Sequence, residues 1–113
     1  MRIESYGFGR MKINGVTYTR DLIVFEDDVK SDWWRIEGHR LHIEDLSYIL
    51  KMKPEVLVVG TGYYGLMKIP PETERRLQAE GIKLIAKRTG EAYKIYNELS
   101  GSKRVAGAFH LTC

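Results

Sequence analysis

The residues best suited to chemistry form a glycine-rich loop at residues 60–65, which reads Gly-Thr-Gly-Tyr-Tyr-Gly after the apolar run 56–59. This G-x-G-x-x-G spacing is that of loops that hold the pyrophosphate of a dinucleotide. Such a loop needs its third glycine where a helix opens, so that free N–H groups face the phosphates. Here four residues separate Gly65 from residues 70–74, Pro-Pro-Glu-Thr-Glu. Because proline has no N–H and glutamate repels phosphate, we expect no cofactor at this loop.

A second candidate site lies where strand 82–87 gives way to a helix expected over residues 90–99. Thr89 suits the N-cap position. The first turn holds no proline, so the N–H groups of Gly90, Glu91 and Ala92 could face a small anion beside Arg88. If the two corners are neighbours, one crevice is bordered by the candidate ligand-binding residues Gly60, Thr61, Gly62, Tyr63, Arg88, Thr89 and Gly90. The competing interpretation is that Thr89 only caps its helix, Arg88 is solvated and Tyr63 covers apolar surface.

The other ionisable and nucleophilic side chains match no catalytic or metal-binding pattern. His39 and His42 form an H-x-x-H pair with no third ligand nearby, and the acidic residues of 27–32 match no calcium loop. We expect His110 to be a packed, hydrogen-bonded histidine on the strand 104–111, facing away from Cys113. The pattern therefore predicts no catalytic residues and no metal, and leans against an enzyme without excluding one.

Trp33 and Trp34 are the candidate interaction residues. They lie in an expected short strand, 32–36, in which neighbouring side chains point to opposite faces. One tryptophan should then enter the core, and the other could be an exposed anchor for a partner, because tryptophan is enriched at binding hot spots.

Strands and helices alternate in the second half of the chain, and the first third is rich in β signals. Asn14-Gly15 between alternating residues predicts a hairpin of 10–13 and 16–19, which residues 21–25 extend as a buried strand. Helices are expected over 43–51, 71–80 and 90–99, and strands over 56–60, 82–87 and 104–111. This order predicts a three-layer α/β fold, with helices on a mixed central sheet and an extra antiparallel β portion from the N-terminal third.

Length and composition favour one soluble domain over residues 1–113. The chain has 113 residues, 43% of them hydrophobic and 29% charged, and a net charge of +3 spread along the sequence. We therefore expect neither a nucleic-acid partner nor a membrane partner. One cysteine and no apolar signal at residues 1–6 favour a cytoplasmic location. Abundant charged residues and few amides indicate a thermophilic source.

The chain resembles the small Mth-type domain family, a family of unknown function. Its relatives include a mitochondrial assembly factor for respiratory complex I and an adipogenesis-associated protein. The resemblance covers most of the chain and rests on Trp34-Arg35 with Gly38-His39, Val58-Val59-Gly60-Thr61-Gly62, Thr89-x-x-Ala92 with Tyr96-Asn97-x-Leu99, and residues 105–113.

The resemblance implies a three-layer fold with a mixed central sheet, and no established catalytic activity. Together with the residues, it favours a non-enzymatic interaction or assembly protein that contacts an unknown protein partner or a second copy of itself. The alternative is a binder of a small anionic ligand, or an enzyme, that uses the crevice between loops 60–65 and 87–90.

Overall fold

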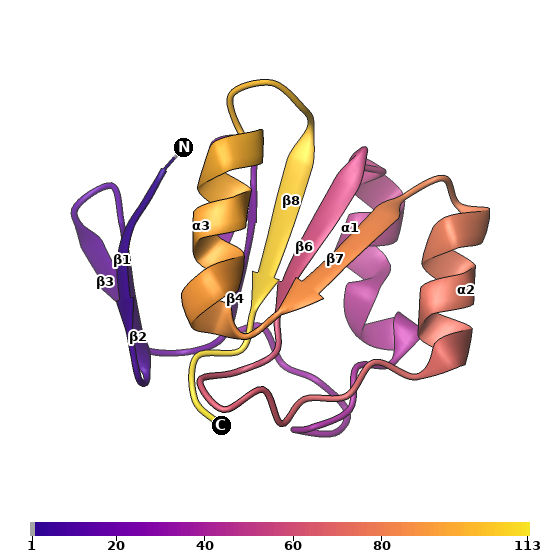
Figure 1. Cartoon of the computed structure of the whole chain (residues 1–113), viewed down its shortest axis with the longest axis horizontal. Coiled ribbons are helices and arrows are strands. Elements are labelled where there is room, and N and C mark those ends of the chain that lie inside the picture. The colour runs from indigo at the N-terminus through magenta and orange to yellow at the C-terminus, as the bar shows by residue number, and fades with distance from the viewer. Residues whose placement is uncertain (1) are drawn as a thin grey trace.

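The computed structural model describes residues 2–113. It contains two separate sheets, one of three strands and one of five (Figure 1). The smaller sheet is antiparallel and consists of β1 (Ile3–Gly7), β2 (Arg10–Ile13) and β3 (Val16–Tyr18). Asn14 and Gly15 join β2 to β3 with φ values of 49° and 78°. Positive φ at both central positions is what a type I′ turn requires, so the predicted hairpin is confirmed.

The larger sheet has the strand order β5-β4-β8-β6-β7. Its strands are β4 (Leu22–Phe25), β5 (Asp28–Lys30), β6 (Val56–Gly60), β7 (Lys83–Lys87) and β8 (Val105–Phe109). Strand β6 pairs in parallel with β7 and β8, whereas β4 runs antiparallel to β5 and β8. The predicted mixed central sheet is therefore confirmed.

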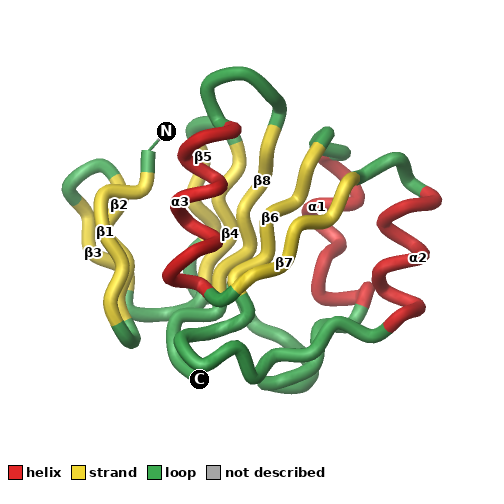
Figure 2. The backbone as a smooth tube through the Cα atoms, viewed as in Figure 1, coloured by secondary structure: helices red, strands yellow, loops and turns green. Residues whose placement is uncertain are grey.

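Helices and the smaller sheet enclose both faces of this central sheet (Figures 1 and 2). Helix α3 (Thr89–Leu99) and the small sheet cover one face, and α1 (Ser47–Met52) and α2 (Pro71–Ala79) lie on the other. Side chains of β6 alternate between two apolar clusters: Val58 packs with the first, and Leu57 and Val59 with the second. The three-layer α/β architecture is thus confirmed.

Two predictions for the first half of the chain are wrong. Residues 32–36 form no strand, because Asp32 has a φ of 58° and the segment turns to direct Arg35 inward. Residues 21–25 do not extend the hairpin: β4 is buried at every position and joins the central sheet instead. The helix expected over 43–51 is confirmed, with a first turn that is 3₁₀, η1 (Ile43–Leu46), and leads directly into α1.

Candidate functional site

The two predicted corners meet at the carboxyl ends of the parallel strands β6, β7 and β8. The N–H of Gly62 donates to Thr89 Oγ1 at 2.9 Å, and the N–H of Thr89 donates to Gly62 O at 3.1 Å. Thr61 donates through its N–H and its hydroxyl to Lys87 O, at 2.9 and 3.1 Å. The loops at 60–65 and 87–90 are therefore neighbours, and they are joined by their own hydrogen bonds.

Thr89 links three segments rather than capping its helix. Its side chain is fully buried, and its hydroxyl donates to His110 O at 2.6 Å while accepting the bond from Gly62. The N-cap residue of α3 is Arg88, which provides no side-chain cap. The predicted N-cap role of Thr89 is therefore wrong. A buried hydroxyl needs hydrogen-bond partners, and this one bonds to Gly62 and His110 rather than to an N–H of its own helix.

The first turn of α3 is also less open to an anion than the sequence suggests. The N–H groups of Glu91 and Ala92 both donate to Arg88 O, at 2.9 and 2.8 Å. These groups are therefore already satisfied, and the prediction that they stand free for a ligand is wrong.

The glycine-rich loop is covered by the last two residues of the described chain. The N–H of Tyr63 donates to Thr112 O at 2.6 Å, and that of Leu66 donates to Cys113 O at 3.0 Å. Gly62 has a φ of 110°, and a Cβ there would collide with the backbone of Cys113. The glycines thus allow close backbone approach, and the N–H groups of Gly62, Tyr63, Gly65 and Leu66 are bonded to the chain itself.

A buried charged cluster that the sequence did not reveal lies beside this corner. Asp21 Oδ2 accepts a hydrogen bond from Arg35 Nη1 at 2.7 Å and lies 2.8 Å from His110 Nδ1, and Asp21 Oδ1 accepts from the N–H of Leu111 at 2.8 Å. Arg35 Nη2 also donates to Gly38 O at 3.0 Å. The cluster ties the irregular segment after β5 to the end of β8, and it confirms that His110 is packed and hydrogen-bonded.

The environment of Asp21 favours its ionised form. Burial alone would raise its pKa, but the hydrogen bonds that it accepts from His110, from the N–H of Leu111 and from Arg35 outweigh burial and hold the pKa below its ordinary value. Within residues 2–113, Arg35 Nε and His110 Nε2 are buried without a hydrogen-bond partner. The signal for Arg35 was its place beside the two tryptophans, whereas nothing local marks Asp21.

The two tryptophans divide as predicted. Trp33 packs partly buried against the second apolar cluster, and its Nε1 donates to Asp45 O at 2.9 Å. The Trp34 side chain is 78% exposed, the largest exposure among the exposed large hydrophobic residues. Trp34 is therefore available to a partner, and Trp33 is committed to the fold.

Aromatic rings gather on the outer side of the candidate crevice. The Tyr63 ring centroid lies 5.6 Å from that of Phe8, 5.1 Å from Tyr64 and 6.3 Å from Tyr6, and Tyr6 lies 6.2 Å from Tyr93. Of the predicted ligand-binding residues, Tyr63, Arg88 and Gly90 line a cavity of about 410 Å³ here, together with Tyr6 and Tyr93 among others. Tyr6, Phe8 and Tyr93 were not predicted, because they lie far from the loop in the sequence; the adjacent Tyr63 and Tyr64 were a local signal.

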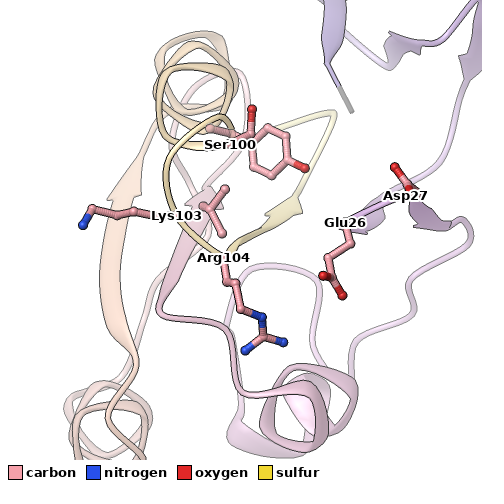
Figure 3. Close-up of a pocket in the computed structure, with 7 residues that line it drawn as sticks. Glu26, Asp27, Ser100, Lys103 and Arg104 are labelled. Atoms are coloured by element: carbon pink, nitrogen blue, oxygen red, sulfur yellow. The ribbon is translucent and has the colours of Figure 1, made fainter.

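The opposite end of the central sheet carries a polar hollow of about 290 Å³ (Figure 3). Figure 3 shows Lys103 extending away from Glu26 and Asp27, so the charged groups do not converge on a common point. Arg104 is engaged with the backbone of Lys53 and Met52 at 3.1 and 3.3 Å. This hollow has no part in the candidate site.

Residues 2–113 lack two further features that would bear on function. They hold no group of three or more His, Cys, Asp or Glu side chains placed to share a metal ion. None of the helices in that range combines the length and apolarity needed to cross a bilayer.

Known structures share this architecture over nearly the whole chain. A conserved hypothetical protein of Pyrococcus horikoshii is 31% identical, with all of both chains covered and a TM-score of 0.85. An outer membrane protein of Bartonella henselae is 24% identical over 98% of this chain and 94% of its own, with a TM-score of 0.83. A Mth938-like domain protein of Bordetella pertussis is 24% identical over 97% and 85%, with a TM-score of 0.69.

The sequence also matches a protein family over residues 3–110, which is almost its entire length. This match agrees with the resemblance that the motifs indicated, and it includes both corners and the buried cluster. The chain belongs to the family described as protein of unknown function (DUF498/DUF598), with the Mth938-like fold.

Proposed function

We propose that the chain is a non-enzymatic interaction or assembly protein that binds a partner protein at the carboxyl end of its parallel strands. One observation carries the proposal. Of the seven large hydrophobic residues exposed in the described chain, all but Val16 lie on the connections at this end: Phe8, Trp34, Ile36, Tyr63, Tyr64 and Leu66. We call these six residues the apolar face; Phe8, Tyr63 and Tyr64 contact one another within it, whereas Trp34 and Ile36 line a separate hollow with Trp33.

The aromatic part of the apolar face has the properties of a binding anchor. Phe8, Tyr63 and Tyr64 contact one another edge to face or tilted, with centroids 5.1 to 6.2 Å apart. Each ring is about half exposed, so a partner could remove much apolar area from water. Aromatic side chains lose little conformational freedom on binding and dominate hot spots.

Cations beside the apolar face favour a partner with acidic residues at its rim. Arg88 lies along Gly65, with its Cγ 3.1 Å from where a Cβ would stand. An isolated β-bridge pairs the backbones of Arg40 and Lys68, and it joins the two loops that carry Ile36 and Leu66. No salt bridge within residues 2–113 involves these three exposed cations. Their charges are available to steer an oppositely charged surface.

The proposal is tested with a photo-cross-linking amino acid at position 64, and at position 16 as the control, in cells that make the protein. The partner cross-linked at position 64 is purified, and its binding is measured by calorimetry. Tyr64→Ala and Trp34→Ala should each weaken binding about tenfold or more, as truncated hot spots do. Val16→Ala should leave the affinity unchanged, and added salt should weaken it.

Two results would contradict the proposal. Equal cross-linking at positions 64 and 16 would show that the apolar face is not preferred. If sedimentation shows a dimer that Tyr64→Ala dissociates, the apolar face binds a second copy rather than an acidic partner.

A further inference from the structure

We propose that the cavity between β1, the loop after β6 and the start of α3 binds a small aromatic anion, namely an aryl carboxylate or aryl phosphate. Its volume of about 410 Å³ lies within the usual range for ligand pockets. We call it the aryl-anion cavity. Gly62 and Thr89, whose hydrogen bonds join the two loops, do not line it. The cavity shares Tyr63 and Arg88 with the proposed protein-binding surface, but its ligand is a free small molecule.

Three tyrosines from separate elements give the cavity its aromatic walls. Tyr6 is the central ring, 6.3 Å from Tyr63 at an interplanar angle of 41° and 6.2 Å from Tyr93 at 52°. The Tyr6 hydroxyl donates to Leu111 O at 2.8 Å, which fixes its ring against the end of β8. Rings held at these angles offer faces and edges to a planar ligand.

The Tyr6 wall presents no negative charge to an anion. Burial raises the pKa of Tyr6 to about 12, and the nearby Tyr63 adds to the rise. Tyr6 is therefore an uncharged phenol at neutral pH and does not repel a carboxylate or phosphate.

Two cations at the cavity supply the charge that an anion needs. Arg88 and Lys94 both line it and are exposed, and neither takes part in a salt bridge in the described part of the chain. Glu91 lines the cavity as well, but its carboxylate lies 4.0 Å from Lys87 Nζ, which offsets its charge. The lining thus carries net positive charge next to apolar rings, which matches a ligand that is planar at one end and anionic at the other.

Gly90 allows the cavity to be blocked without disturbing the fold. It lines the cavity, its φ is not positive, and an added Cβ would meet no atom within 4 Å. Gly90→Leu should therefore place an isobutyl group at the cavity, with a Cβ that meets no other atom. Gly101 shares the open surroundings and lies beyond the other end of α3, so Gly101→Leu is the matched control.

The test uses 2-naphthyl phosphate and 2-naphthoate as probes, with 2-naphthamide as the neutral analogue and inorganic phosphate as the anion without a ring. Binding is followed on the purified protein by probe fluorescence and by amide chemical shifts. We expect saturable binding of an aryl anion, with shifts at residues 90 and 93, and about tenfold weaker binding of the neutral and ringless compounds.

Among the variants, Gly90→Leu should weaken binding about tenfold, and Gly101→Leu should leave it unchanged. Arg88→Gln and Lys94→Gln should each weaken the aryl anions and not the amide. The proposal fails if neither aryl anion binds at millimolar concentration, if Gly90→Leu binds like the parent, or if the amide or inorganic phosphate binds as well. Tyr64 does not line the cavity, so Tyr64→Ala should keep probe binding even where it abolishes partner binding.

Discussion

Replacing Asp21 by asparagine should show how much of the stability depends on the buried charged cluster. The Asp21 carboxylate lies 2.7 Å from Arg35 Nη1, and the Arg35 side chain is only 5% exposed. Asparagine keeps the shape and one acceptor but removes the charge, so the guanidinium remains buried without its counter-ion. Breaking a buried pair in this way typically costs about 3–5 kcal/mol. Since Arg35 keeps its bond to Gly38, we expect about 3 kcal/mol for Asp21→Asn.

The measurement is urea unfolding at neutral pH, with Asp32→Asn as the matched control. Asp32 pairs with Arg20 at 3.3 Å, but the two side chains are 68% and 78% exposed. Such a surface pair contributes less than about 1 kcal/mol. If Asp21→Asn costs no more than Asp32→Asn, the cluster contributes no special stability and our reasoning is refuted.

A double-mutant cycle with Arg35→Met measures the interaction energy between Asp21 and Arg35. With both charges gone, the double variant should be more stable than the sum of the single losses predicts, because no buried charge is left alone. Additive losses would mean that Asp21 acts through His110 and the N–H of Leu111 rather than through Arg35.

The pH dependence of the same comparison follows from the lowered pKa of Asp21. A folded-state pKa below the ordinary 3.8 means that the ionised carboxylate stabilises the fold above that pH, and that this stabilisation is lost as the pH falls through the folded-state pKa. The difference in unfolding free energy between the parent and Asp21→Asn should therefore be constant near neutral pH and shrink below about pH 4. A difference that grows in acid would contradict this assignment.

Three further predictions concern the corner and the core. Gly60→Ala should lower the free energy of unfolding by about 1–3 kcal/mol, because its Cβ would lie 2.6 Å from Thr89 Oγ1. Gly90→Ala places its Cβ in open space and should cause no loss. Urea unfolding compares the two variants, and equal losses would contradict the packing argument. Thr89→Val should cost about 1–3 kcal/mol because it removes two buried hydrogen bonds, and the partly exposed Thr61→Val should cost less than about 1 kcal/mol in the same assay. Burial raises the pKa of Tyr96 to about 12, so the stability present below pH 10 should fall as the pH rises toward 12. Tyr96→Phe should reduce that loss of stability in unfolding curves measured at alkaline pH. An unchanged loss would exclude Tyr96 as its source.

The parts of the fold that could be predicted from the sequence are those with local signals. Asn14 and Gly15 specify their turn by themselves, because few other residues adopt two successive positive φ values. Strand β6 was recognisable as an apolar run long enough for a strand, and Gly81, with a φ of 78°, marked the end of α2. Alternation of these elements then predicted the parallel pairing of β6 with β7.

The buried cluster could not be predicted, because its members are far apart in the sequence. Arg35 and His110 are separated by 75 residues, and Asp21 and His110 by 89. The tryptophans and Ile36 favour an extended strand locally, but the chain must turn to bring Arg35 to its carboxylate. Tertiary contacts therefore overrode β propensity in the segment 32–36.

The glycine-rich loop shows how one spacing can serve two physical purposes. In a dinucleotide site, glycines let a ligand's phosphates approach the backbone. Here they let other parts of the same chain approach: Thr89 and Phe109 crowd Gly60, Cys113 passes over Gly62, and Gly65 turns with a φ of 72°. Because the N–H groups of Tyr63, Gly65 and Leu66 are bonded to carbonyls of the chain, we expect recognition at this corner to depend on side chains that point outward. The groups left to meet a partner or a ligand are therefore the outer rings and cations, and the G-x-G-x-x-G pattern itself serves the fold.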